Sequence, residues 1–109
     1  MDTNNFETGA IRGQMPRTGQ REHSAPLYLT SSFVFPGPYE MEAAFRGEAE
    51  GNIYSRYSNP NTDELVHKIC AMEGAEDGFA LASGMSAVFA SMAAFLRSGD
   101  HILASRAVF

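Results

Sequence analysis

The chain has 109 residues, with 13 acidic side chains against 8 lysines and arginines and a formal net charge of −5. This length allows one domain at most, and the charge argues against a nucleic acid as main partner, because duplex binding requires a basic surface. The single cysteine, Cys70, excludes an internal disulfide and is expected to be structural. No apolar run is long enough for a membrane span or signal peptide, so we expect a cytoplasmic protein.

The first 38 residues are rich in glycine and proline and predict an extended arm without a core of its own. A short helix is expected over residues 8–12. Residues 27–35 are rich in β-forming side chains but do not alternate cleanly. An arm with this apolar content is expected to pack against a body outside these residues or against a neighbouring subunit.

Two amphipathic helices are predicted next, over residues 39–46 and 61–73. Asn61 or Thr62 would cap the second, since Asn61 and Glu64 have capping-box spacing, and Gly74 would end it. The sequence thus predicts an arm and loop over residues 1–60 and the start of an α/β domain over residues 61–109.

The last part of the chain predicts a β-α-β unit. Residues 78–82 and 101–105 are short apolar runs suited to buried strands, and residues 85–96 form an almost wholly apolar helix. Parallel strands joined in this way should have a right-handed crossover and need cover on both faces. We therefore expect the chain to be the N-terminal portion of a longer α/β protein.

Two motifs suggest an anion-binding site. Tyr54-Ser55-Arg56-Tyr57 places two phenols around one guanidinium, which can grip a phosphate with its planar fork. Ser83-Gly84-Met85 joins an apolar run to a helix, where free N–H groups and the helix dipole favour an anion. Taken separately, the first motif is more typical of a solvated surface arginine, and the second of ordinary turn chemistry, than of a ligand site. The chain has neither a dinucleotide fingerprint nor a P-loop, and its three histidines lack the spacing of metal ligands.

Together these motifs resemble the Cys/Met-metabolism family of pyridoxal-phosphate (PLP) enzymes. The resemblance rests on residues 52–60 and 82–87, with further matches at residues 8–12, 26–33, 73–76 and 98–101. It implies a fold-type I PLP-dependent transferase, of which this chain would supply the arm and the first β-α-β part. One departure is Asn61, which stands before Thr62 where the family usually has threonine directly after Asn-Pro.

The resemblance also implies roles for four residues. Gly84 and Met85 match the positions whose N–H groups hold the PLP phosphate, while Tyr54 and Arg56 match a pair that reaches the phosphate of a neighbouring subunit's PLP. It implies dimers assembled into a tetramer. The lysine that binds PLP in this family has no counterpart here, since Lys68 lies in an unrelated helix. Residues 1–109 alone are therefore expected to be inactive.

Within the family, the chain is most similar to the branch that uses O-succinylhomoserine and sulfide to form homocysteine. The cystathionine γ-synthase and methionine γ-lyase branches are the alternatives inside the family. Two readings outside PLP catalysis also stay open, namely a phosphate-binding α/β module and a non-catalytic interaction protein that pairs with larger relatives.

Overall fold

A computed structural model describes residues 5–13 and 15–108. These residues form four helices, α1 (Phe6–Arg12), α2 (Pro38–Phe45), α3 (Pro60–Glu73) and α4 (Gly84–Ala93). The chain divides into two compact units, Met1–Phe79 and Ala80–Phe109. The predicted boundary at residues 60 and 61 concerns domains of a longer protein and stays a prediction. In the described residues, no helix is long and apolar enough to cross a membrane.

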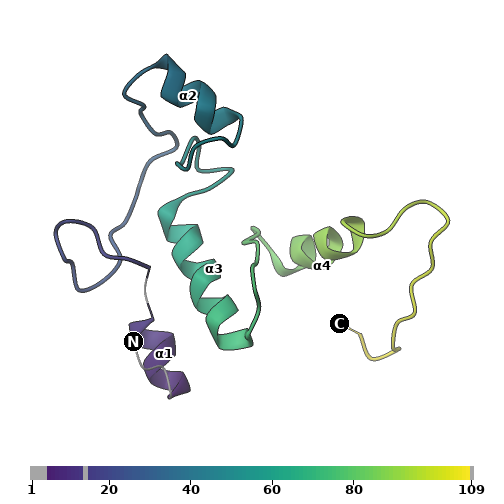
Figure 1. Cartoon of the computed structure of the whole chain (residues 1–109). Helices are drawn as coiled ribbons and strands as arrows, with labels where there is room; N and C mark the ends of the chain where they lie inside the picture. Colours follow the sequence, from purple (N-terminus) through teal and green to yellow (C-terminus); the bar gives the residue numbers. More distant parts are fainter. Residues whose placement is uncertain (1–4, 14, 109) are drawn as a thin grey trace. The chain divides into compact units, whose positions relative to one another are not determined.

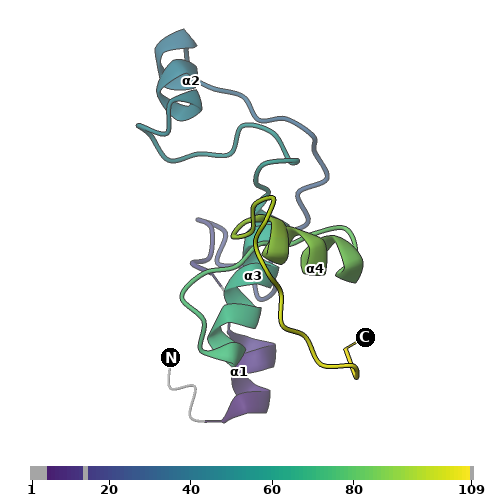
Figure 2. The same ribbon diagram turned by 90° about the vertical axis from the view of Figure 1, so that its right-hand side faces the viewer.

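In the first unit, α1 packs against α3 (Figures 1 and 2). The arm that follows α1 runs to α2, and the chain then returns through residues 46–58 to the start of α3 (Figure 1). Helices α1 and α2 form where the sequence predicts them, with ends shifted by one or two residues. Asn5 caps α1 by accepting a hydrogen bond from Glu7 N, and Pro38 occupies the first turn of α2.

Helix α3 begins earlier than predicted, because Asn59 is its N-cap. Asn59 has extended backbone angles (φ −150°, ψ 137°), and its side-chain oxygen accepts a hydrogen bond from Asn61 N at 2.9 Å. The following Pro60 explains this choice, since proline pushes the preceding residue out of the helical region and suits the first helical position. The predicted capping box of Asn61 and Glu64 is therefore wrong.

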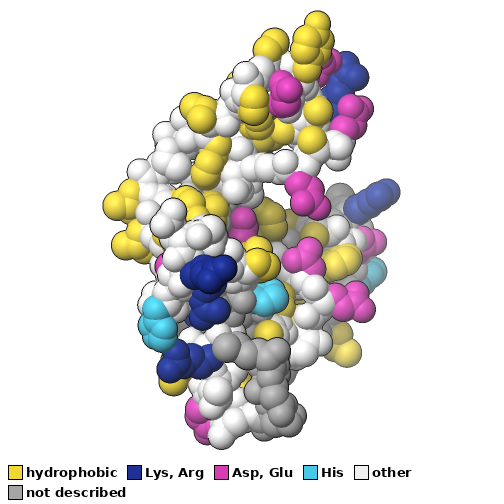
Figure 3. Space-filling model, turned by 60° about the vertical axis from the view of Figure 1, so that its left-hand side comes forward, with side chains coloured by type: hydrophobic (Ala, Val, Ile, Leu, Met, Phe, Trp, Pro, Cys, Tyr) yellow, Lys and Arg dark blue, Asp and Glu magenta, His cyan; other side chains and the backbone are white. Residues whose placement is uncertain are grey.

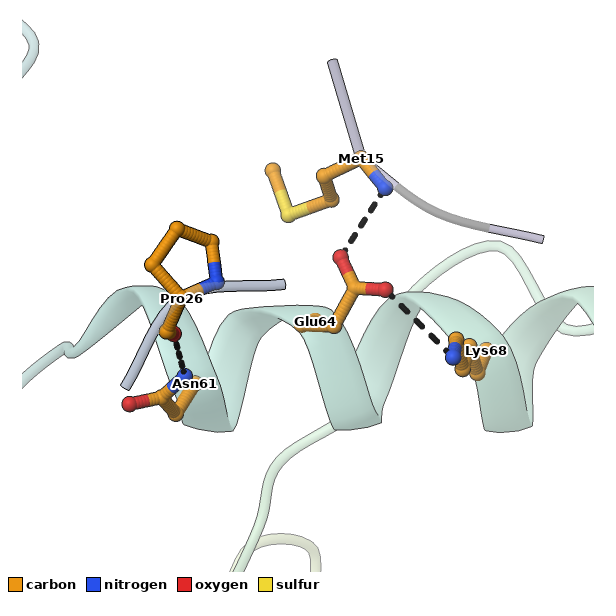
Figure 4. A network of polar contacts seen from close by, with 5 residues as sticks. All are labelled: Met15, Pro26, Asn61, Glu64 and Lys68. Atoms are coloured by element: carbon orange, nitrogen blue, oxygen red, sulfur yellow. Dashed lines mark hydrogen bonds and ion pairs between the residues drawn. The ribbon is translucent and has the colours of Figure 1, made fainter. Parts of the chain in front are cut away.

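The carboxylate of Glu64 does not cap the start of α3 but binds the arm. Glu64 is 9% exposed, and its Oε2 accepts a hydrogen bond from Met15 N at 2.9 Å. Its Oε1 lies 3.6 Å from Lys68 Nζ (Figure 4). One turn earlier, Asn61 donates from Nδ2 to Pro26 O at 2.6 Å and accepts from Tyr28 N at 2.8 Å. Two separate parts of the arm are thus fastened to one helix.

The predicted end of α3 is confirmed. Gly74 is left-handed (φ 67°, ψ 28°), and its N–H donates to Cys70 O, as in the common glycine C-cap. The chain then turns back, and at Gly78 a Cβ atom would lie 3.2 Å from Cys70 Sγ. A free, half-buried Cys70 in this position is consistent with the structural role predicted for it.

The predicted β-α-β detail is not confirmed. Residues 78–82 and 101–105 carry no strand pairing, and the one β-bridge among the described residues joins Ser32 to Tyr54. A strand requires a neighbour to accept and donate its backbone hydrogen bonds, and these two runs have none in the described residues. The helix between them does form, but α4 ends at Ala93, three residues before the predicted end.

Candidate functional site

The loop that carries Tyr54 and Arg56 is closed by its own hydrogen bonds. Tyr57 N and Ser58 N both donate to Tyr54 O, at 2.8 and 3.2 Å. The hydroxyl of Ser58 donates to Asn52 Oδ1 at 2.6 Å, which ties the two ends of the loop together. These bonds form a tight turn that presents the side chain of Arg56 from its tip.

A second set of hydrogen bonds joins this loop to the arm. Ser32 and Tyr54 form an antiparallel bridge, and Ser55 N donates to Ser31 O at 2.9 Å. The side chain of Asn59 donates to Tyr28 O at 3.2 Å and to Ser55 Oγ at 2.9 Å. Asn59 is 8% exposed, so its amide lies inside the junction of arm, loop and helix. The position of the Arg56 loop is therefore set by the arm as well as by α3.

Arg56 lies close to the rings of both flanking tyrosines. Its guanidinium carbon is 5.0 Å from the centroid of Tyr54 and 5.8 Å from that of Tyr57, which is within cation–π range. Arg56 is exposed, and it forms no ion pair with any carboxylate among the described residues. The loop thus holds the guanidinium within cation–π distance of two rings, while its charge stays available to an anion.

The start of α4 offers a second group of donors. Ser83 is the N-cap, and its hydroxyl oxygen accepts a hydrogen bond from Ser86 N at 3.1 Å. The N–H groups of Gly84 and Met85 make no hydrogen bond within the described part of the chain. A Cβ atom built on Gly84 would meet no atom within 4 Å, so the space beside this backbone is open. These features suit an anion approaching the helix N-terminus.

The predicted site residues fall in both units. Tyr54 and Arg56 belong to the first unit, and Gly84 and Met85 belong to the second. The structure brings the members of each pair together. Sequence reasoning missed Asn59 as the residue that joins the arm to the loop, although the Asn-Pro step was a signal for an N-cap. In the described residues, no group of three or more potential metal ligands occurs.

The chain belongs to a family of PLP-dependent enzymes. The matching family model is that of the Cys/Met metabolism PLP-dependent enzymes, and it covers residues 7–109.

Named relatives agree with this assignment. The chain is 47% identical over 104 residues to an O-succinylhomoserine sulfhydrylase of Pseudomonas aeruginosa. The matched residues make up 95% of this chain and 26% of the relative. The chain is 40% identical over 105 residues to an L-methionine gamma-lyase of Pseudomonas putida, with the same two shares. The chain thus spans about a quarter of the length of these curated relatives.

A solved structure shows the same local fold. The protein is a Campylobacter jejuni chain assigned as an O-acetylhomoserine (thiol)-lyase, with 38% identity and a TM-score of 0.81. The match covers 88% of the present chain and 24% of the Campylobacter jejuni chain. That structure carries N'-pyridoxyl-lysine-5'-monophosphate. The match is consistent with a fold-type I architecture.

The donor groups of this chain fit the phosphate of such a cofactor. Arg56 supplies a held but unpaired guanidinium, and Gly84 and Met85 supply free N–H groups beside open space. Phosphate monoesters favour both kinds of donor.

Proposed function

We propose that the protein containing this chain is a PLP-dependent enzyme of sulfur amino-acid metabolism. It would replace the acyloxy group of O-succinylhomoserine, or of another O-acylhomoserine, with sulfide, which gives homocysteine for methionine biosynthesis and releases succinate or the corresponding carboxylate. The observation that carries the proposal is the Arg56 guanidinium held within cation–π distance of two tyrosine rings in a chain of this family. Bound PLP supplies the electron sink that such chemistry needs.

In this proposal the described residues anchor the phosphate of the cofactor. Gly84 and Met85 donate N–H groups to it at the start of α4. Tyr54 and Arg56 contact the phosphate of the PLP in a neighbouring subunit, within a homotetramer. Lys68 is no candidate for the PLP-binding lysine, because it lies within α3 and has no relation to the lysine motif of the family.

The main alternative concerns the substrate. An identity of 40% to a methionine γ-lyase leaves γ-elimination from methionine as a second candidate activity, and cystathionine γ-synthase chemistry as a third. The purified native polypeptide should be assayed for homocysteine from O-succinylhomoserine and sulfide, beside O-acetylhomoserine, cysteine and methionine as competing substrates. Methanethiol released from methionine as the main product would overturn the sulfhydrylase assignment.

The phosphate role of Arg56 is tested by its affinity for PLP. A charge-assisted hydrogen bond is worth about 1.5–3 kcal/mol, so Arg56→Ala should weaken PLP binding about tenfold to a hundredfold. Arg46→Ala is the matched control, because Arg46 is exposed and pairs only with Glu42. Equal PLP affinities for the two variants, measured by fluorescence titration of the native polypeptide, would contradict the role.

A mixing experiment tests whether Arg56 acts across subunits. Arg56→Ala is co-assembled with Gly84→Val, in which the added side chain would enter the open space beside the helix start. If each site combines α4 of one subunit with Arg56 of the other, a mixed dimer contains one intact site. Random mixing should then restore about a quarter of the sites. If both groups come from one chain, mixing restores none.

A further inference from the structure

A basic cavity in the first unit has no part in the proposed cofactor site. It has a volume of about 310 Å³, and its charged and polar lining residues are Arg12, Arg17, His23, Ser24 and Lys68. It shares no residue with Tyr54, Arg56, Gly84 or Met85. Figure 3 shows lysine, arginine and histidine side chains gathered on the lower left of the face in view.

This concentration of charge is unusual for an acidic chain. Three of the 8 lysines and arginines line one cavity, although the net charge is −5. No carboxylate is among the lining residues. Bringing like charges together raises the free energy of the fold unless an opposite charge is present. Glu64 and Glu22 offset part of the positive charge, and an anion in the cavity would offset the rest.

Neighbouring groups hold the three cations in place. Arg12 Nη1 donates to His23 Nε2 at 3.3 Å, so its partner in this contact is an imidazole and not a carboxylate. Arg17 Nε donates to Glu22 O at 2.7 Å. Lys68 pairs with Glu64 at 3.6 Å. Held donors lose less side-chain entropy when they bind a ligand than free ones do.

The two nearby carboxylates are already occupied. Glu64 accepts a hydrogen bond from Met15 N. Glu22 accepts from Thr18 N at 2.8 Å and from Thr18 Oγ1 at 2.7 Å. Bonds from the side chain and backbone of Thr18 lower the pKa of Glu22 below its ordinary value. Both carboxylates keep their negative charge, so the three cations and these two carboxylates leave a net charge of +1.

We propose that this cavity binds a small, doubly charged oxyanion, of the phosphate or dicarboxylate class. Arginine forks match both kinds of oxyanion. The volume is at the lower end of the range for small-molecule sites, so the ligand is small.

The test is a titration of the PLP-loaded native polypeptide with inorganic phosphate and, separately, with succinate, at constant ionic strength set by sodium chloride. Saturable binding of either probe supports the proposal and identifies the class. Arg12→Gln should weaken that binding about tenfold, as expected for the loss of one charge-assisted hydrogen bond. Arg17→Gln is the second variant, should Arg12→Gln fail to fold. Arg46→Gln, with the same loss of charge outside the cavity, should bind as the parent does.

A chemical readout locates the ligand. The bound probe should slow phenylglyoxal modification of Arg12 and Arg17 and leave that of Arg46 unchanged, as measured by peptide mass spectrometry. Absence of saturable binding for both probes would overturn the proposal, and so would equal weakening by Arg46→Gln. PLP binding is measured separately, so these outcomes do not depend on the cofactor roles proposed above.

Discussion

The side chain of Asn59 makes three hydrogen bonds to three different parts of the chain. Its Oδ1 caps α3 through Asn61 N, and its Nδ2 reaches Tyr28 O in the arm and Ser55 Oγ in the loop. A nearly buried amide with these partners leaves several polar groups unsatisfied when it is removed. No other single side chain described here joins the arm, the loop and the helix.

Asn59→Ala should therefore destabilise the junction by about 2–3 kcal/mol, the sum of a lost cap and unsatisfied partners. Asn5→Ala is the control, because Asn5 is also an N-cap but is exposed, and within the described residues its side chain makes a hydrogen bond to Glu7 N alone. That variant should cost about 1 kcal/mol or less. Urea unfolding of the native polypeptide gives both values. Equal losses would show that the two extra bonds of Asn59 contribute nothing.

Asn61 shows where residue-scale prediction from sequence fails. The sequence predicts that its departure from the family pattern alters little, since Thr62 can still serve the helix start. In the structure its amide instead binds Pro26 O and Tyr28 N. Those partners lie 35 and 33 residues away in the sequence, and a local sequence pattern cannot predict a contact between residues so far apart in the chain.

At the scale of elements, helices and strands differ in how far sequence predicts them. All four helices were predicted, because caps, proline and glycine signals act within a few residues. The 78–82 and 101–105 strands were not observed, because a strand depends on a partner elsewhere. The same contrast between local and long-range contacts holds for the candidate site. The stacking of Arg56 on Tyr54 and Tyr57 follows from adjacency, whereas the arm contacts that fix this loop do not.

The end of α3 gives a prediction at this scale. Gly74 has φ 67°, so an alanine there adopts the left-handed region at a cost of about 1 kcal/mol, although no atom obstructs its Cβ. Gly74→Ala should speed hydrogen exchange of Ala75 N–H, which donates to Cys70 O, about fivefold. Gly19→Ala, at an equally open position without positive φ, should leave that rate unchanged. An unchanged rate in Gly74→Ala would contradict this account of the helix end.

At the scale of the whole molecule, the described chain has almost no core. Ala44 is the one buried apolar residue in the described part, at 8% exposure. Large apolar side chains in both units are exposed, among them Leu29 at 91%, Val34 at 98% and Phe95 at 85%. Burial of such side chains is the main source of stability in folded domains, and here it is nearly absent.

A polypeptide restricted to residues 1–109 should accordingly unfold without a cooperative transition and should bind the dye ANS. The native polypeptide serves as the comparison, and calorimetry with far-ultraviolet circular dichroism provides the measurement. A sharp two-state transition for residues 1–109 would mean that these apolar side chains find partners within the chain itself.

The hydrogen bonds shared by the arm and the Arg56 loop have a thermodynamic consequence. A contact that orders the arm also restrains the loop. By thermodynamic reciprocity, an anion that binds to the loop also stabilises the ordered position of the arm. If the arm contacts a second subunit and Arg56 contacts its cofactor, assembly and cofactor retention become linked equilibria. Dilution would then release cofactor, and added cofactor would oppose dissociation.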